Sequence, residues 1–514
     1  MDYSKKKVEV KSDFIRISRD ISEEEKAIVD ARKVNVHIQL QKLGINCHLS
    51  NIPNIALLGS GGGLRAMIAL QGVLGELQNQ GLMDVVMHLC GVSGSTWCMS
   101  QIYEKEEWTK ELPILEEQLC DKLANSCWDR LKAFEALIEP SKDDTFSLTD
   151  FWGSVIVYAM VHELDNNCLT EERTVSVNGK VPYPIYAAVD LEKLDDNNKY
   201  RSDMWFEFTP HEAGFFSPGA FVDMKVFGNK FKNGKLMSHK EEKRISYLRG
   251  LWGSAIADLH KDMDFIIDKK DSNTYKLCIS LKERHSTFAK SERLSKTLTL
   301  AQTLYIEFTV ENSTLLMHED LLGNPCDKLR ILGKILSCLF TWDWGTIPNY
   351  LYKYTDLDDK DLSDKEDFHL VDAGLAINSA YPLVLRPERE VKLILSFDFS
   401  DGDPFATVKQ AAMYCEENQL PFPDINESEL EKSKDNPLDC YVFPSKGNSP
   451  VVMHFPLFNS VNCEGDVADW RHKYSTSNFS YEEQEIKNLL EAAKINVRNN
   501  KEIILQEMKK LLVL

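Results

Sequence analysis

Two short loops rich in glycine and serine constrain the fold of this chain more than any other feature. The first reads GSGGGLR at residues 59–65, and the second reads GVSGS at residues 91–95. Each follows a short continuous apolar run, at residues 52–58 and 85–90, as buried strands do. Apolar residues recur at helical spacing after the first loop. This order of strand, loop, helix, strand, turn and helix predicts an α/β fold with a mostly parallel central sheet flanked by helices.

Ser93, in the second loop, is the candidate nucleophile. A serine between small residues on a tight strand-to-helix turn is typical of the nucleophile of serine hydrolases. The usual pattern is G-x-S-x-G, whereas this chain has Ser95 at the fifth position. A purely structural turn is therefore the alternative. Ser95 and Ser100 are weaker candidates, because neither occupies the centre of such a turn.

The first loop is predicted to stabilise an oxyanion. Glycine loops and helix N-termini both direct backbone N–H groups at anions, which makes Gly62 and Gly63 the candidate donors. A nucleotide-binding loop is the alternative, but G-x-x-x-x-G-K-[ST] is absent and residue 64 is leucine where G-x-G-x-x-G needs glycine. Arg65 could bind a substrate phosphate through its forked guanidinium, and an ordinary ion pair is its alternative role. Together the two loops predict acyl transfer by an esterase or lipase.

The residues alone leave the identity of the general base open. Asp372 stands in a V-D-A-G segment, where a turn at a strand end can direct a carboxylate at a neighbouring loop. Asp398, in the apolar run 391–399, is a competing carboxylate. A Ser–Asp–His order would require His454 or His472, and His454 lies in an apolar run where a core histidine is the simpler interpretation.

Bulk composition excludes several classes of protein. The 60 Lys and Arg residues against 80 Asp and Glu give a net charge of −20, which argues against nucleic acid as a partner. None of the 12 cysteines forms a CxxC pair, so no metal site or cofactor is expected. The charged start and the lack of an apolar run of membrane-spanning length predict a cytoplasmic protein.

The chain is predicted to form one catalytic unit over residues 1–514. Residues 245–371 alternate polar and short apolar segments, which suggests a cap or lid inserted into this unit. An apolar stripe at helical spacing predicts a C-terminal helix within residues 480–514.

Ten segments of the chain identify a family resemblance. The chain resembles the catalytic domain of the group IV cytosolic phospholipases A2, gamma-like members above all, whose fold is patatin-like. The matching segments occur in the same order as in that family. The resemblance rests on GSGGGLRA from residue 59, GVSGSTW from 91, SLTDFW from 147, PYPIYAAVD from 182, WFEFTPHEAGF from 205, LRGLWGSA from 248, WDWGT from 342, VDAGLAINSAYPLVLRP from 371, LILSFDFS from 393 and LPFP from 420.

The resemblance implies a serine–aspartate dyad without histidine. By motif match Ser93 is the nucleophile, Asp372 the base, Gly62 and Gly63 the oxyanion donors, and Arg65 the phosphate ligand, while Asp398 becomes structural. The implied activity is a calcium-independent phospholipase A2 that acts through an acyl-enzyme, with lysophospholipase and transacylase activity. The alternative is a catalytically silent lipid-surface scaffold that retains the fold.

Membrane contact is expected to be peripheral, at the surface of intracellular phospholipid membranes. Only 58 residues precede Gly59, whereas a C2 sandwich needs about 100, so docking is expected not to need calcium. The last four residues contain no prenylation cysteine. A basic segment at residues 221–244, with Phe227 and Phe231 in it, is the candidate docking loop, and an ordinary solvated loop is its alternative.

Overall fold

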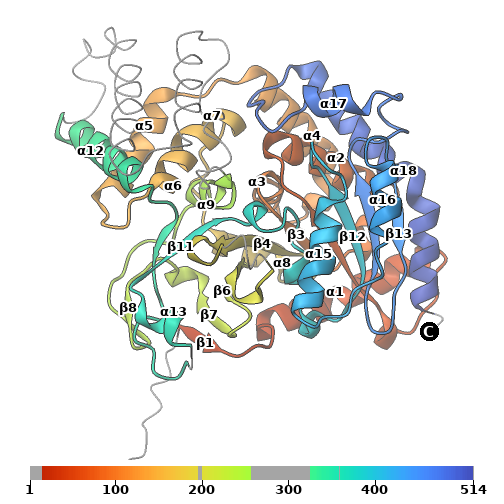
Figure 1. The fold of residues 1–514 in the computed structure, drawn as a ribbon, viewed down its shortest axis with the longest axis horizontal. Helices are drawn as coiled ribbons and strands as arrows, with labels where there is room; N and C mark the ends of the chain where they lie inside the picture. Colours follow the sequence, from red (N-terminus) through yellow and green to blue (C-terminus); the bar gives the residue numbers. More distant parts are fainter. Residues whose placement is uncertain (1–13, 195–199, 256–324, 358, 513–514) are drawn as a thin grey trace, which may run out of the picture.

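A twelve-stranded mixed sheet forms the centre of the molecule (Figure 1). The computed structural model describes residues 14–194, 200–255, 325–357 and 359–512. The main strand order is β1-β7-β6-β5-β4-β3-β2-β12-β14-β13, and β10 and β11 join beside β4.

The five central strands are parallel and almost entirely buried. They are β14 (Val451–Pro456), β12 (Val391–Asp398), β2 (Asn54–Gly59), β3 (His88–Gly91) and β4 (Tyr183–Asp190). Their apolar runs confirm the predicted α/β class. The strand predicted at 85–90 begins later than expected, because residues 83–85 form a 3-10 turn instead.

Antiparallel strands extend both sides of this centre. On one side lie β5 (Trp205–Phe208), β6 (Glu212–Phe215), β7 (Ala220–Asp223) and β1 (Ile15–Ile17), and on the other lies β13 (Tyr441–Phe443). The strand β11 (Asp367–Asp372) runs antiparallel to β4 and carries β10 (Thr346–Pro348) at its outer edge. β5 pairs with one edge of β4, so β3 and β11 both pair with its other edge, β3 with the first half of β4 and β11 with the second half.

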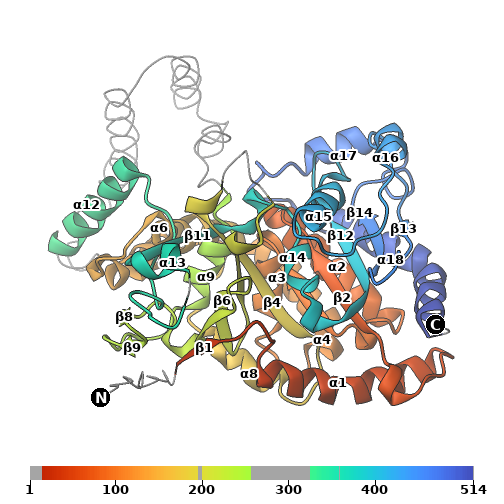
Figure 2. The ribbon, with the colours of Figure 1, turned by 60° about the horizontal axis from the view of Figure 1, so that its bottom comes forward.

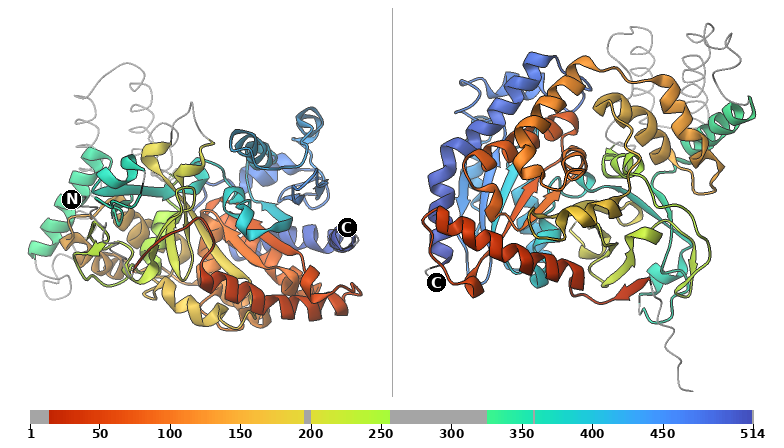
Figure 3. Two further views of the ribbon diagram at one scale, coloured as in Figure 1. Left: turned by 90° about the horizontal axis from the view of Figure 1, so that it is seen from below. Right: turned by 180° about the vertical axis from the view of Figure 1, so that it is seen from behind.

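Helices cover both faces of the sheet (Figure 3). On one face α2 (Gly63–Asn79) packs against α18 (Glu483–Leu511) and α4 (Trp108–Asn125), while α15 (Ala406–Glu417) covers the other. The predicted C-terminal helix is therefore present as α18, and its apolar stripe packs on α2. A Cβ atom at Gly72 would lie 2.7 Å from the carbonyl oxygen of Leu490, so the glycine permits this close approach.

The remaining elements surround this framework. The helix α1 (Glu23–Lys42) begins at the N-cap Ser22, whose hydroxyl accepts the amide of Glu25 at 3.0 Å. The helix α12 (Pro325–Thr341) lies at the opposite end of the molecule from α18 (Figure 2). The other helices and the small hairpin are α3 (Gly94–Ile102), α5 (Arg130–Ile138), α6 (Leu148–Phe151), α7 (Tyr158–Val161), α8 (Glu172–Ser176), α9 (Ile245–Trp252), α13 (Lys360–Asp364), α14 (Tyr381–Val384), α16 (Glu427–Ser433), α17 (Val467–Lys473), β8 (Phe231–Lys232) and β9 (Lys235–Leu236).

Two expectations concern regions around the sheet. The predicted cap at 245–371 includes α9, α12 and β11, but its centre, residues 256–324, lies outside the described residues, so the cap stays a prediction. The candidate docking segment at 221–244 does not present its two phenylalanines, Phe227 and Phe231, at the surface. Both are buried, and Phe227 packs edge-on against Phe208, because the basic segment folds back onto the aromatic side of the sheet.

None of the described helices is both long enough and apolar enough to cross a bilayer.

Candidate active site

Strand register brings Ser93 and Asp372 to one place. On the shared edge of β4, Gly91 of β3 pairs with Tyr186 and Asp372 of β11 pairs with Ala188. The strand β3 ends at Gly91, and Ser93 follows two residues later, in the turn that leads into α3. Asp372 is the last residue of β11, which runs antiparallel to β4, and the hydroxyl of Ser93 lies close enough to act on its carboxyl. Two residues far apart in the sequence thus meet at one edge of the sheet.

Ser93 occupies a strained turn. Its φ of 52° and ψ of −125° lie where residues other than glycine are rare, at a cost of about 1–3 kcal/mol. It is the N-cap of α3 and 7% exposed. Ser95 is fully buried, and its hydroxyl donates to the carbonyl of Ser60 at 2.7 Å. Ser95, which stands where the usual motif has glycine, therefore links the serine turn to the glycine loop through this hydrogen bond.

Asp372 is a fully buried carboxyl at the end of β11. Burial raises its pKa to about 7, although the amide of Gly374 and the hydroxyl of Ser93 both act to lower it. The Gly374 amide donates to Oδ1 at 2.8 Å, and the Asp372 amide donates to Ser254 Oγ at 3.3 Å. Oδ2 has no partner in full hydrogen-bond geometry among the described residues. The Ser93 hydroxyl thus lowers the pKa of the carboxyl without forming a tight hydrogen bond with it. Such loose hydrogen bonds are common in catalytic pairs when no substrate is bound.

The glycine loop presents unused N–H groups beside this pair. Gly62 has φ of 151°, and Gly63, the first residue of α2, has φ of 56°. No acceptor within the described ranges pairs with either amide. A Cβ atom at Gly94 would lie only 1.9 Å from the carbonyl oxygen of Gly63, so the serine turn and the glycine loop are in direct contact. Sequence reasoning missed this role of Gly94, and its position directly after the nucleophile was the available signal.

Asn378 is a second residue that sequence reasoning missed. Its carbonyl accepts the amide of Gly61 at 3.1 Å, and its Nδ2 donates to the carbonyl of Gly61 at 3.2 Å and to Ser400 Oγ at 3.3 Å. Asn378 follows Asp372 by six residues, so it joins the segment of the base to the glycine loop. A polar residue inside the apolar segment after V-D-A-G was its only sequence signal.

Arg65 lies behind the glycine loop and is 1% exposed. Its Nη1 forms an ion pair with Asp401 at 3.2 Å, and its Nε donates to the carbonyl of Phe399 at 2.6 Å. Burial would raise the pKa of Asp401, but Arg65 and the donors of Thr476 lower it below its ordinary value. Arg65 therefore forms the ion pair that the sequence analysis gave as its alternative role. Phosphate binding by Arg65 stays a prediction.

The competing bases have other partners. His454 is fully buried, a ring nitrogen (Nε2) lies 2.7 Å from the carbonyl of Pro404, and burial lowers its pKa. Asp398 accepts the amide of Ser400 at 2.8 Å and the hydroxyl of Thr407. In the part of the chain that the structure describes, no histidine forms a hydrogen bond with Ser93 or Asp372.

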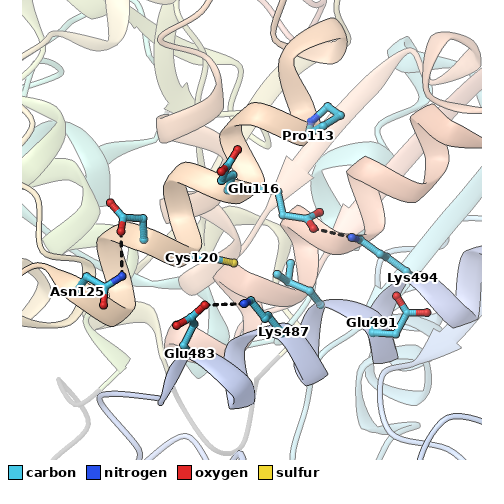
Figure 4. A pocket seen from close by; sticks show the side chains of 11 residues that line it. Pro113, Glu116, Cys120, Asn125, Glu483, Lys487, Glu491 and Lys494 are labelled. Carbon is cyan, nitrogen blue, oxygen red and sulfur yellow. Dashed lines mark hydrogen bonds and ion pairs between the residues drawn. The ribbon is translucent and has the colours of Figure 1, made fainter.

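A cleft of about 530 Å³ lies elsewhere, between α4 and α18 (Figure 4). Its lining is mostly charged and includes the ion pairs Lys494–Glu116 and Lys487–Glu483. Neither Ser93 nor Asp372 lines it, so it does not serve the dyad. No cluster of three or more His, Cys, Asp or Glu side chains suited to a metal ion occurs among the described residues.

Comparisons with known proteins identify the family and the fold. The family model described as the lysophospholipase catalytic domain matches residues 55–315. Mouse cytosolic phospholipase A2 gamma is 37% identical, over 95% of this chain and 91% of the relative. The human protein of the same name is 38% identical, over 97% and 96%. The structure of human GIVD cytosolic phospholipase A2 matches with a TM-score of 0.74 at 25% identity, over 97% of this chain and 68% of that one.

These matches confirm the resemblance that the ten sequence segments indicated. The chain belongs to the family of lysophospholipase catalytic domains that includes the cytosolic phospholipases A2.

Proposed function

We propose that this protein is a calcium-independent phospholipase A2 and lysophospholipase that uses Ser93 and Asp372 as a catalytic dyad. One observation carries the proposal: a strained serine lies beside a fully buried carboxyl, whose pKa burial raises to about 7. Membership of the phospholipase family supports the substrate class. A base whose pKa lies near the working pH is the most effective proton acceptor, so no imidazole is needed between the two residues.

The first half-reaction acylates the serine. Asp372 takes the proton of the Ser93 hydroxyl as Oγ attacks the ester carbonyl of the lipid. The negative charge that forms on the carbonyl oxygen is stabilised by the N–H groups of Gly62 and Gly63 at the positive end of α2. The intermediate then expels the lysophospholipid, whose leaving oxygen receives the proton from Asp372.

The second half-reaction releases the fatty acid. Asp372 takes a proton from water, the resulting hydroxide attacks the acyl carbonyl, and Ser93 leaves with the returned proton. A lysophospholipid hydroxyl that replaces this water gives transacylation instead. Protein groups handle every charge and proton in this scheme, so the proposed reaction calls on neither calcium nor a cofactor.

The proposed setting is the cytoplasm, at the surface of phospholipid membranes. The basic segment keeps exposed lysines beside Met237, which is 62% exposed, and such a surface suits an anionic leaflet. The exposed lysines are Lys225, Lys230, Lys232, Lys235 and Lys240. The whole chain is proposed to act as one catalytic unit with the cap at 245–371.

Release of labelled fatty acid from phosphatidylcholine vesicles tests the proposal. The wild type is expected to release fatty acid, whereas Ser93→Ala and Asp372→Asn are expected to show almost none. Matched controls are Ser428→Ala and Asp424→Asn, which change exposed residues away from the site. Equal release by wild type and Ser93→Ala would overturn the nucleophile assignment. A folded wild type that releases nothing would favour the silent lipid-surface scaffold.

A further inference from the structure

The guanidinium of Arg65 is held on every side by protein atoms. Besides Phe399 and Asp401, it contacts the C-terminal segment between α17 and α18, where Nη1 donates to the carbonyl of Tyr474 and Nη2 to the hydroxyl of Thr476 at 3.0 Å. Four of its five N–H groups are therefore used. With 1% of the residue exposed, a lipid phosphate could reach it only after this segment moved away.

These contacts form a closed ring rather than separate bonds. The Thr476 hydroxyl accepts from Arg65 and also donates to Asp401 Oδ2 at 3.1 Å, and the Thr476 amide donates to the same oxygen at 2.8 Å. Asp401 in turn pairs with Arg65 at 3.2 Å. Each member of the ring thus has its partners within the protein, as buried charged groups require.

The ring fixes the backbone of the oxyanion loop. A Cβ atom at Gly62 would lie 2.7 Å from Arg65 Nη2 and 3.1 Å from the carbonyl oxygen of Phe399, to which Arg65 Nε donates. Gly62 is therefore enclosed by the guanidinium and the carbonyl that the guanidinium binds. Since φ at Gly62 is 151°, this enclosure sets the direction of a backbone N–H group that has to meet the oxyanion.

We propose that Arg65 is a positioning residue for the oxyanion loop, and that Asp401 and Thr476 complete the clamp around it. Arg65 then contributes to the hydrolysis of any acyl ester, whether or not the ester carries a phosphate. This inference rests on the proposed function, because it assumes that Ser93 attacks an ester beside Gly62.

Two substrates that differ only in the phosphocholine group separate positioning from phosphate binding. Lysophosphatidylcholine and a monoacylglycerol with the same acyl chain are presented in the same detergent micelles, and kcat and KM are measured for each. Arg65→Gln is expected to lower kcat by about 10²-fold on both substrates, as the loss of an oxyanion donor does, with KM little changed. Arg65→Lys is expected to lose nearly as much, because lysine keeps the charge but not the fork.

Thr476→Val tests the clamp from its other side and keeps the test valid if Arg65 variants do not fold. It is expected to lower kcat on both substrates by roughly tenfold, since a hydrogen bond to a charged group is lost. The matched control is Thr341→Val, an exposed threonine on α12.

The inference is overturned if Arg65→Lys or Arg65→Gln loses activity on lysophosphatidylcholine alone, or if Thr476→Val behaves like the wild type. Failure of the proposed function would show itself differently, as full activity of Ser93→Ala on both substrates.

Discussion

Replacing Asp372 with asparagine should abolish activity and at the same time stabilise the protein above neutral pH. The carboxyl is fully buried, and its pKa is about 7 instead of the ordinary 3.8. Between these two pH values the folded protein holds a proton that the unfolded chain has lost. The free energy of unfolding therefore falls as pH rises through this window, and this loss of stability is complete above pH 7.

The size of this effect follows from the two pKa values. Their difference corresponds to a cost on the order of 4 kcal/mol once the carboxyl is ionised in the folded protein. Asparagine has nearly the same shape, carries no charge, and can still accept the Gly374 amide through its carbonyl oxygen. Asp372→Asn should thus be more stable than the wild type by up to this amount above pH 7, and no more stable below pH 3.8.

Urea unfolding of both proteins from pH 5 to pH 8.5 measures the difference. The midpoint of Asp372→Asn should rise relative to the wild type as pH increases and then level off above about pH 7. Ser93→Ala, equally inactive, serves as the control and should not gain stability, because it removes a donor that helps the carboxylate. Equal midpoints at pH 8, or a gain that does not change with pH, would refute the reasoning.

Three further predictions concern the loops and the chemistry. Gly94→Ala should lose all measurable kcat, because its Cβ atom would lie 1.9 Å from the carbonyl oxygen of Gly63; a variant with wild-type kcat would show that the loops need not touch. Ser95→Ala should lower the free energy of unfolding by about 1 kcal/mol and reduce kcat without abolishing it, since only the bond to Ser60 is lost; complete inactivity of the folded variant would make Ser95 a reacting group. A chelator should leave vesicle hydrolysis unchanged, and a collapse of activity would reveal a metal requirement.

Much of the site could be predicted from the sequence where the signal is local. The glycine loop and the serine turn follow from turn chemistry within a few residues, and β2, β3 and β12 follow from continuous apolar runs. The meeting of Ser93 with Asp372 does not, because it depends on the register of β3 and β11 along one edge of β4. Only the family resemblance selected Asp372 over Asp398 and His454.

The failures of prediction have a common physical cause. Burial is a property of the folded molecule, so the sequence could not show that the two phenylalanines of the basic segment lie inside the protein, with Phe227 packed on Phe208. The ion pair of Arg65 could not be assigned from the sequence either, because its partner, Asp401, lies far along the chain. The short antiparallel strands β5 to β7 gave no signal as clear as that of the central strands.

The most direct test of the dyad is the rate at which an alkyl fluorophosphonate modifies Ser93, followed by mass analysis of the labelled peptide across pH. Wild type and His454→Gln are predicted to react at rates that rise with pH through an apparent pKa near 7 and then level off, while Asp372→Asn reacts at least about 10²-fold more slowly. Labelling of Asp372→Asn at the wild-type rate, or loss of labelling in folded His454→Gln, would contradict a carboxylate acting directly on the serine.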